Sequence, residues 1–311
     1  MNIIFFGSSQ FAVPALKALI KSGHKIPCVV TQPDRKKGRG LHLSTTEVKM
    51  VAEDASLKIY QPANINSPEA VNYLKSLLPD LFVAVAYGQI LSQEVLDIPK
   101  IFSINIHASL LPKYRGAAPI NRAIIRDEKN TGITIIKLVK EMDAGPIILQ
   151  ESIDIEELDT ALNLEEKLAK MGAGLLPETL KAIENKKFEL KAQDERGVSL
   201  APKLKKEDAR INWEKPAREI YNLIRGCFLK PGAFTYYQGK LLKIYKAETS
   251  PCVHSIAGAP GEIAQVSKDG LVVVTGEGNL TIKELQIEGK RRMTVEDFIA
   301  GHKIKRGQRL G

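Results

Sequence analysis

The sequence has little cysteine, and its cysteines are not spaced to build a structural centre. Only three of the 311 residues are cysteine, namely Cys28, Cys227 and Cys252. They are odd in number, far apart in the chain and without the close pairs that hold zinc. This pattern excludes a disulfide framework, argues against a structural metal, and fits a reducing compartment.

Long apolar runs are also missing. Runs such as residues 81–86 are far shorter than the roughly 20 residues that cross a bilayer. The first residues lack the basic start, the extended apolar stretch and the small-residue cleavage site of a signal peptide. We therefore expect a cytoplasmic protein without a membrane span.

No compositional bias points to a disordered or fibrous chain. Hydrophobic residues make up 44% and charged residues 26%, as in ordinary globular proteins. At roughly 100 to 200 residues per domain, the length predicts two domains. The formal net charge is +9, and residues 206–311 hold 18 Lys or Arg against 12 Asp or Glu, whereas residues 1–205 hold 27 against 24. Most of the positive excess lies near the end of the chain, which makes a polyanionic partner worth testing.

Residues 1–188 alternate short apolar runs with helical patterns, which is typical of a mostly parallel sheet with crossover helices. One helix is expected at 11–22, and Ser67 is expected to cap another that ends near residue 78. A last helical stretch at 164–185 is expected to be interrupted by two glycines and a proline. We predict a Rossmann-like α/β catalytic domain. Its expected strands are 2–6, 26–31, 58–61, 81–86, 102–107, 132–139 and 147–150.

Residues 189–205 are polar and rich in structure breakers, which indicates a linker, and residues 206–311 follow as a second domain. A helix is expected at 216–225, and Thr294 with Asp297 forms a capping box for a helix at 295–300. Short strands joined by glycine turns suggest an OB-like β-barrel, a fold that binds oligonucleotides. The expected strands are 233–237, 240–247, 261–266, 271–275 and 280–285.

The turn Gly7-Ser8-Ser9 follows the first strand, where an open α/β sheet places a ligand-binding loop. The chain lacks the Gly-x-Gly-x-x-Gly pattern there, which argues against a dinucleotide. Two interpretations remain open. Gly7 either makes only a tight turn, or residues 8–11 form a wall of the substrate site.

Residues 102–107 alternate apolar and polar side chains, and a strand projects every second side chain to the same face. Asn105 and His107 therefore stand together at the carboxyl end of a predicted strand. Ligand sites of α/β sheets lie at this end. A buried polar group without a partner costs about 1–3 kcal/mol, so both side chains need partners.

Asp143 lies in a turn between two predicted strands. Aspartate is an ordinary turn residue, so its position alone does not assign it a catalytic role. Together, however, an amide, an imidazole and a carboxylate supply what acyl transfer to an amine requires. They can stabilise a tetrahedral oxyanion and accept the proton of the amine.

Three motifs carry a family resemblance: Asn105-Ile106-His107-Ala108-Ser109-Leu110-Leu111-Pro112, then Arg115-Gly116-Ala117-Ala118-Pro119-Ile120, and Met142-Asp143-Ala144-Gly145 downstream. They resemble the formyltransferase family that uses 10-formyltetrahydrofolate. The resemblance implies that Asn105 and His107 hold the oxyanion, that Asp143 orients or charges His107, and that no metal is needed. It also implies two folate-binding segments, formed by Ser109, Leu110, Leu111 and Pro112 and by Val85, Ala86, Tyr87 and Gly88.

Three further features resemble the members of this family that act on methionyl-tRNA: the 31–40 loop, the 203–213 junction and the basic second domain with residues 289–293. They imply initiator methionyl-tRNA as the acceptor. Separately, we expect the chain to act as a monomer. Without the resemblance, a run of charged residues of this kind would be interpreted simply as solvent-exposed surface. The predicted RNA contacts are Arg39, our first choice, with Arg35, Lys36 and Lys37 in the 34–43 loop, and Lys290, Arg291 and Arg292.

Other functions compete with this interpretation. The formyl acceptor is alternatively a small amine, such as a ribonucleotide or an amino sugar, or water, which would make the chain a hydrolase of the formyl-folate. A protein of another class would bind RNA without catalysis and use the Asn-x-His strand only as core. The basic loop and the basic second domain favour tRNA, because a small acceptor needs neither.

Overall fold

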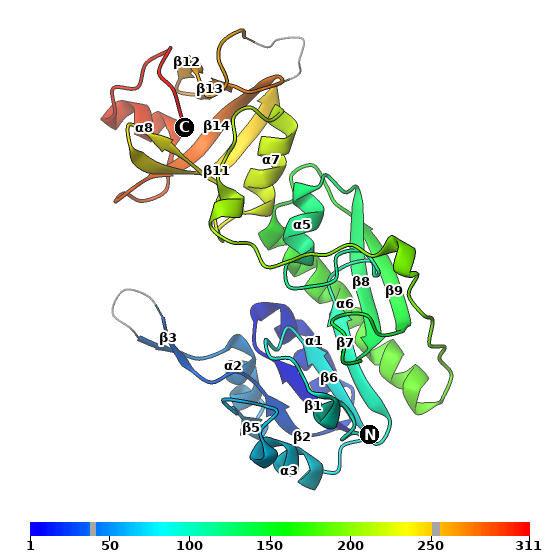
Figure 1. Ribbon diagram of the computed structural model, residues 1–311. Helices are drawn as coiled ribbons and strands as arrows, with labels where there is room; N and C mark the ends of the chain where they lie inside the picture. The colour runs from blue at the N-terminus through cyan, green and yellow to red at the C-terminus, as the bar shows by residue number, and fades with distance from the viewer. Residues whose placement is uncertain (38–41, 251–255) are drawn as a thin grey trace. The chain divides into compact units, whose positions relative to one another are not determined.

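The computed structural model describes residues 1–37, 42–250 and 256–311, and the chain forms two compact units (Figure 1). Each unit is assembled from three separate stretches of sequence, so the chain passes repeatedly from one unit to the other. Unit 1 comprises Met1–Gly116, Asn130–Ile153 and Glu165–Ala201, and unit 2 comprises Ala117–Lys129, Asp154–Leu164 and Pro202–Gly311.

Unit 1 is built on a seven-stranded sheet with the order β5-β2-β1-β6-β7-β8-β9. The pairs from β5 to β7 are parallel, and β8 runs antiparallel to β7. The predicted Rossmann-like, mostly parallel sheet is thus confirmed. The strands are β1 Asn2–Gly7, β2 Lys25–Val30, β5 Ile59–Tyr60, β6 Leu81–Val85, β7 Phe102–His107, β8 Asn130–Lys137 and β9 Ile147–Asp154.

Hydroxyl caps begin several helices of unit 1. The side chain of Ser67 accepts a hydrogen bond from the Ala70 amide, which confirms the predicted start of α3. Thr46 and Ser92 cap two helices that the sequence analysis had not predicted. The helical elements are the 3₁₀ turn η1 Gln10–Ala12, α1 Val13–Lys21, α2 Glu47–Asp54, α3 Pro68–Ser76, α4 Gln93–Leu96 and α6 Ala161–Glu184; a further 3₁₀ turn, η2 Glu195–Gly197, follows.

The segment predicted as a loop at 34–43 contains the two strands of a hairpin, β3 Arg35–Lys37 and β4 His42–Ser44. Alternating apolar residues are missing here, which is why the pattern indicated no strand. Figure 1 shows this hairpin extending away from the sheet of unit 1. Arg39 lies outside the described residues.

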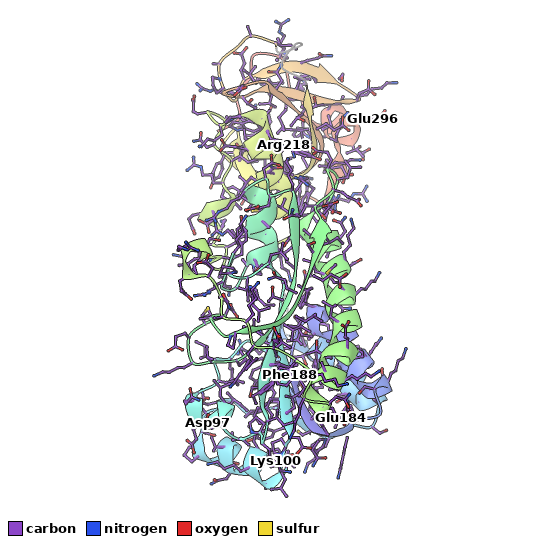
Figure 2. The ribbon with its side chains drawn as sticks, turned by 90° about the vertical axis from the view of Figure 1, so that its right-hand side faces the viewer. Asp97, Lys100, Glu184, Phe188, Arg218 and Glu296 are labelled. Atoms are coloured by element: carbon purple, nitrogen blue, oxygen red, sulfur yellow. The ribbon has the colours of Figure 1, made fainter. Side chains whose placement is uncertain are left out.

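The prediction of an interrupted helix at 164–185 was wrong, because α6 is one continuous helix of 24 residues with Pro177 inside it. Gly172 allows the helix to approach β7. A Cβ atom at this position would lie 2.9 Å from Cγ2 of Ile106, whereas one at Gly174 would meet nothing within 4 Å. Phe188, labelled with Glu184 in Figure 2, follows α6 in sequence and packs edge to face on Phe102.

Unit 2 contains an all-antiparallel sheet with the order β10-β11-β14-β13-β12, and β15 pairs with β14. The last residues join the two edges of this sheet, since the Ile263 amide donates to the Gln308 carbonyl and the Gly311 amide donates to that of Tyr236. This closure fits the predicted OB-like fold. The strands are β10 Phe234–Tyr237, β11 Lys240–Ser250, β12 Ile263–Ser267, β13 Gly270–Val274, β14 Asn279–Ile287 and β15 Met293–Thr294.

Helix α5, which follows directly after the Arg115-Gly116 motif, completes unit 2 by packing on α7. The Asn121 side chain donates to the Gly226 carbonyl at 2.7 Å. The guanidinium of Arg218, labelled in Figure 2, binds the Asp127 carboxylate. The remaining elements are α5 Pro119–Ile125, η3 Glu207–Ala209, α7 Ala217–Gly226 and α8 Val295–Gly301, the last capped by Thr294 as predicted. Among all described helices, none has the length and apolar character needed to span a membrane.

Two glycines of α6 provide a matched test of this packing. Gly172→Ala should destabilise unit 1 by about 1–3 kcal/mol, because the added methyl group overpacks the contact with Ile106. Gly174→Ala should instead stabilise it by about 0.5–1 kcal/mol, since alanine is the better helix residue and the space is open. Urea unfolding of both variants checks this. Equal stability of the two would contradict the close approach of α6 to β7.

Candidate active site

Asn105 and His107 lie on one face of β7, at the edge where the parallel strand β6 also ends. His107 is only 6% exposed, and Asn105 is half-buried. Among the described residues, nothing is hydrogen-bonded to the side-chain amide of Asn105. Its donor and acceptor groups are therefore available to a ligand. The two residues differ in this respect, because Nε2 of the His107 ring is already hydrogen-bonded.

The His107 ring lies between a carbonyl and a carboxylate. Its Nε2 is 3.0 Å from the Tyr114 carbonyl oxygen, and because a carbonyl only accepts, Nε2 carries a proton and donates it. Its Nδ1 is 3.6 Å from Oδ1 of Asp143, close enough for an ion pair and too long for a hydrogen bond. A second proton at Nδ1 would therefore meet a negative charge, as a proton relay needs.

The Asp143 carboxylate is oriented by backbone. Its Oδ2 accepts a hydrogen bond of 2.9 Å from the Gly116 amide, which leaves Oδ1 facing His107. The turn itself is tightly closed, because a Cβ atom at Gly145 would lie 1.7 Å from the Lys137 carbonyl oxygen. Only glycine fits there. The three residues predicted as catalytic thus come from two segments, with His107 and Asp143 brought into contact.

The first predicted folate-binding segment, residues 109–112, is organised by the buried hydroxyl of Thr134. This hydroxyl donates to the Ser109 carbonyl at 2.6 Å and accepts from the Leu111 amide at 3.1 Å. Gln150 donates to the same hydroxyl and to the Leu111 carbonyl. The Ser109 hydroxyl in turn donates to the Lys113 carbonyl. The loop is therefore held from within, and Leu110 and Pro112 keep part of their surface exposed.

The second predicted folate-binding segment, residues 85–88, follows β6 at the same edge of the sheet. Val85 and Tyr87 are buried, whereas Ala86 and Gly88 are exposed. The Tyr87 ring packs edge to face on Phe6 in the core, and burial raises the pKa of its hydroxyl. Its side chain therefore supports the segment, and the exposed backbone at 86 and 88 is what a ligand can contact.

The turn after β1 joins the ends of three strands. The Ser8 hydroxyl donates to the Tyr87 carbonyl at 2.9 Å and accepts from the Gln32 amide. Further along the segment that follows β2, Asp34 accepts a hydrogen bond from the Lys49 ammonium, and this bond lowers the pKa of its carboxyl group. Ser8 thus joins the ends of these strands, and the wall of a substrate site at residues 8–11 stays a prediction.

The predicted RNA contacts fall in different parts of the chain. Arg35 begins β3, is exposed and donates to the Gln32 side chain, and Lys36 and Lys37 follow it in the same strand. The other group, Lys290, Arg291 and Arg292, belongs to unit 2. Arg292 is already engaged there, since it pairs with Glu284 and lies over the rings of Phe228 and Tyr245.

Part of the segment predicted as a linker binds the backbone around the site, which the sequence did not predict. We call residues 193–201 the strap. The Ser199 carbonyl accepts from the Arg115 amide, and its hydroxyl accepts from the Tyr114 amide. The Gln193 amide reaches the carbonyls of the Asp143 turn. A polar stretch gives no signal for such contacts, because they join residues about 50 to 85 positions apart.

Along the described ranges, residues 1–37, 42–250 and 256–311, no group of three or more His, Cys, Asp or Glu side chains is placed to hold a metal ion.

Comparison with known proteins identifies the family. Residues 1–180 match the family described as formyl transferase, and residues 203–303 match formyl transferase, C-terminal domain. The chain belongs to the formyl transferase family. The two matches follow one another along the sequence in the order that the predicted domains have.

Relatives match along the whole length. A methionyl-tRNA formyltransferase of Acetivibrio thermocellus is 46% identical and aligned over 100% of both chains. One of Thermodesulfovibrio yellowstonii is 47% identical over 98% of this chain and 97% of its own. Among solved structures, a sugar 3N-formyl transferase, WlaRD, has a TM-score of 0.69 at 22% identity, covering 94% of this chain and 99% of its own. That likeness shows the fold alone.

The Thr134 hydroxyl offers a test of how the loop is held. Thr134→Val keeps the shape but removes a donor and an acceptor for buried groups, and should cost about 1–3 kcal/mol of unfolding free energy. Thr134→Ser keeps the hydroxyl and loses one methyl group, which should cost only about 0.8 kcal/mol. Chemical denaturation compares them. A valine variant no less stable than the serine variant would argue against the network.

Proposed function

We propose that this chain transfers the formyl group of 10-formyltetrahydrofolate to the free amino group of methionyl initiator tRNA, giving N-formylmethionyl-tRNA. The observation that carries the proposal is the full-length similarity, at 42–47% identity, to proteins named methionyl-tRNA formyltransferase. The site at the end of β7 supplies groups suited to acyl transfer. We further propose that the chain acts as a monomer in the cytoplasm.

In this reaction the neutral amine attacks the formyl carbon, and a tetrahedral intermediate with a negative oxygen forms. The unengaged amide of Asn105 donates to this oxygen. The amine loses its proton to Nδ1 of His107, the ring nitrogen that does not bond the Tyr114 carbonyl, and the protonated Nδ1 then donates to the negative oxygen. The Asp143 carboxylate 3.6 Å away stabilises the protonated ring. As the carbonyl re-forms, the bond from the formyl carbon to the folate nitrogen breaks, and that nitrogen takes the proton from Nδ1.

The RNA contacts are assigned to two basic groups, residues 35–39 and residues 290–292. Phosphate contacts of this kind give affinity and salt dependence rather than sequence selection. The engagement of Arg292 with Glu284 supports Lys290 and Arg291, which are exposed, as the better contacts of the second group.

The proposed function is tested by measuring formyl transfer to charged initiator tRNA, to small amines and to water under one set of conditions. We expect transfer to the tRNA to exceed the others by orders of magnitude in kcat/KM. Efficient transfer to a ribonucleotide or an amino sugar, or release of formate alone, would favour another acceptor. RNA binding without any turnover would favour a protein that only binds RNA.

His107→Ala should reduce kcat by about 10²- to 10³-fold or more, the loss typical of one oxyanion donor, with the fold intact. His24→Ala removes the same ring from a partly exposed position near the N-terminus and should leave turnover unchanged. Steady-state kinetics with circular dichroism checks both. A folded His107→Ala enzyme with normal turnover would remove His107 from the mechanism.

Arg39→Ala should raise KM for tRNA and reduce the slope of log affinity against log salt by about one, because one phosphate contact is lost. Folate affinity should not change. Lys21→Ala, at an exposed cation of α1, serves as the matched control. Binding is measured by titration at several salt concentrations. If Arg39→Ala weakened folate and tRNA binding equally, the assignment of Arg39 as an RNA contact would be untenable.

A further inference from the structure

Gln193 connects the two turns that frame the His107–Asp143 pair, and every hydrogen-bonding group of its side chain is used. The amide nitrogen donates to the Asp143 carbonyl at 2.7 Å and to the Gly145 carbonyl at 2.8 Å. The amide oxygen accepts from Nε and Nη2 of Arg115 at 3.1 and 2.8 Å. This complete set fixes which end of the amide is nitrogen.

The contacts act on both supports of the Asp143 carboxylate. On one side, the carbonyls of Asp143 and Gly145 are the backbone of the turn that carries the carboxylate. On the other side, Arg115 precedes Gly116, whose amide binds Oδ2 of Asp143. A single side chain therefore sets the spacing between the carboxylate and the amide that orients it.

This turn needs such a tie because its backbone is not in a relaxed conformation. Asp143 has a φ of 52°, in the left-handed region that non-glycine residues seldom adopt. Strained residues of this kind persist where their surroundings hold them. The two bonds from Gln193 lie immediately at this residue and at Gly145, two positions further on.

We propose that Gln193 is a positioning residue that holds Asp143 at its working distance from His107, without touching the substrate. The inference rests on the proposed function for its kinetic consequence only. A displacement of a catalytic group by about 1 Å can lower the rate about 10²-fold. Loss of the hydrogen bonds from Gln193 should therefore lower kcat and leave substrate binding unchanged.

The decisive variant is Gln193→Glu, which keeps the shape and still accepts from Arg115. It cannot donate to the carbonyls of Asp143 and Gly145, and it places oxygen against oxygen there. We expect kcat to fall at least 10-fold, KM for tRNA and folate to stay within about 3-fold, and the acidic limb of the kcat pH profile to move.

Glu195→Gln is the matched control. Glu195 also binds Arg115 and lies on the same strap, but its side chain is 72% exposed and, among the described residues, makes no hydrogen bond or ion pair to the Asp143 turn. It should keep kcat and the pH profile of the unchanged enzyme. An equal loss in both variants would show that the Arg115 contacts matter and would overturn the role of the Asp143 tie.

A second measurement separates this inference from the proposed function. The NMR signals of the His107 ring, recorded at one pH in the enzyme alone, should shift in Gln193→Glu and not in Glu195→Gln, since a displaced carboxylate changes the field at Nδ1. If the unchanged protein formylated no tRNA, the proposed function would fail while these ring signals still decided the role of Gln193. Unshifted His107 ring signals, or normal kcat with a normal pH profile, would overturn it.

Discussion

The approach of a buried imidazole to a half-buried carboxylate is the constraint around which unit 1 is arranged. His107 and Asp143 are distant in sequence, and bringing their charges together costs desolvation unless both are held by other groups. Hydrogen bonds from backbone groups offset this desolvation. The Tyr114 carbonyl takes one ring nitrogen and the Gly116 amide takes one carboxylate oxygen, so the remaining nitrogen and oxygen face each other at 3.6 Å.

The fold supplies these backbone groups through close approaches that depend on particular residues. The antiparallel strand β8 follows β7 in the sheet, and the turn after β8 closes tightly enough that only glycine fits at Gly145. Thr134, paired with His107 in register, faces the loop that leaves β7 and binds it. Strand β8, which neighbours β7 in the sheet, therefore also holds the loop that follows β7.

Local patterns predicted the parts of this arrangement that local physics determines. Strand β7 has the predicted bounds, since strict alternation over six residues indicates a strand. Ser67 and Thr294 cap helices as predicted, because their hydroxyls accept hydrogen bonds from the amides three residues ahead. Gly172 misled the prediction of α6, since a glycine that permits close packing looks the same in sequence as one that ends a helix. The roles of Thr134 and Gln193 could not be predicted, because their partners are defined only once distant segments have met.

Helix α5 raises a question of timing during synthesis. Residues 117–129 leave the ribosome directly after the loop that carries Arg115 and Gly116, but the helix on which they pack, α7, begins only at Ala217. For the time needed to make about 90 further residues, at roughly 5–20 residues per second, the apolar face of α5 has no permanent partner. The order in which the chain is made therefore leaves the segment that follows Gly116 in sequence exposed for several seconds, and nascent chains halted in this interval should be good clients for chaperones that bind apolar helices.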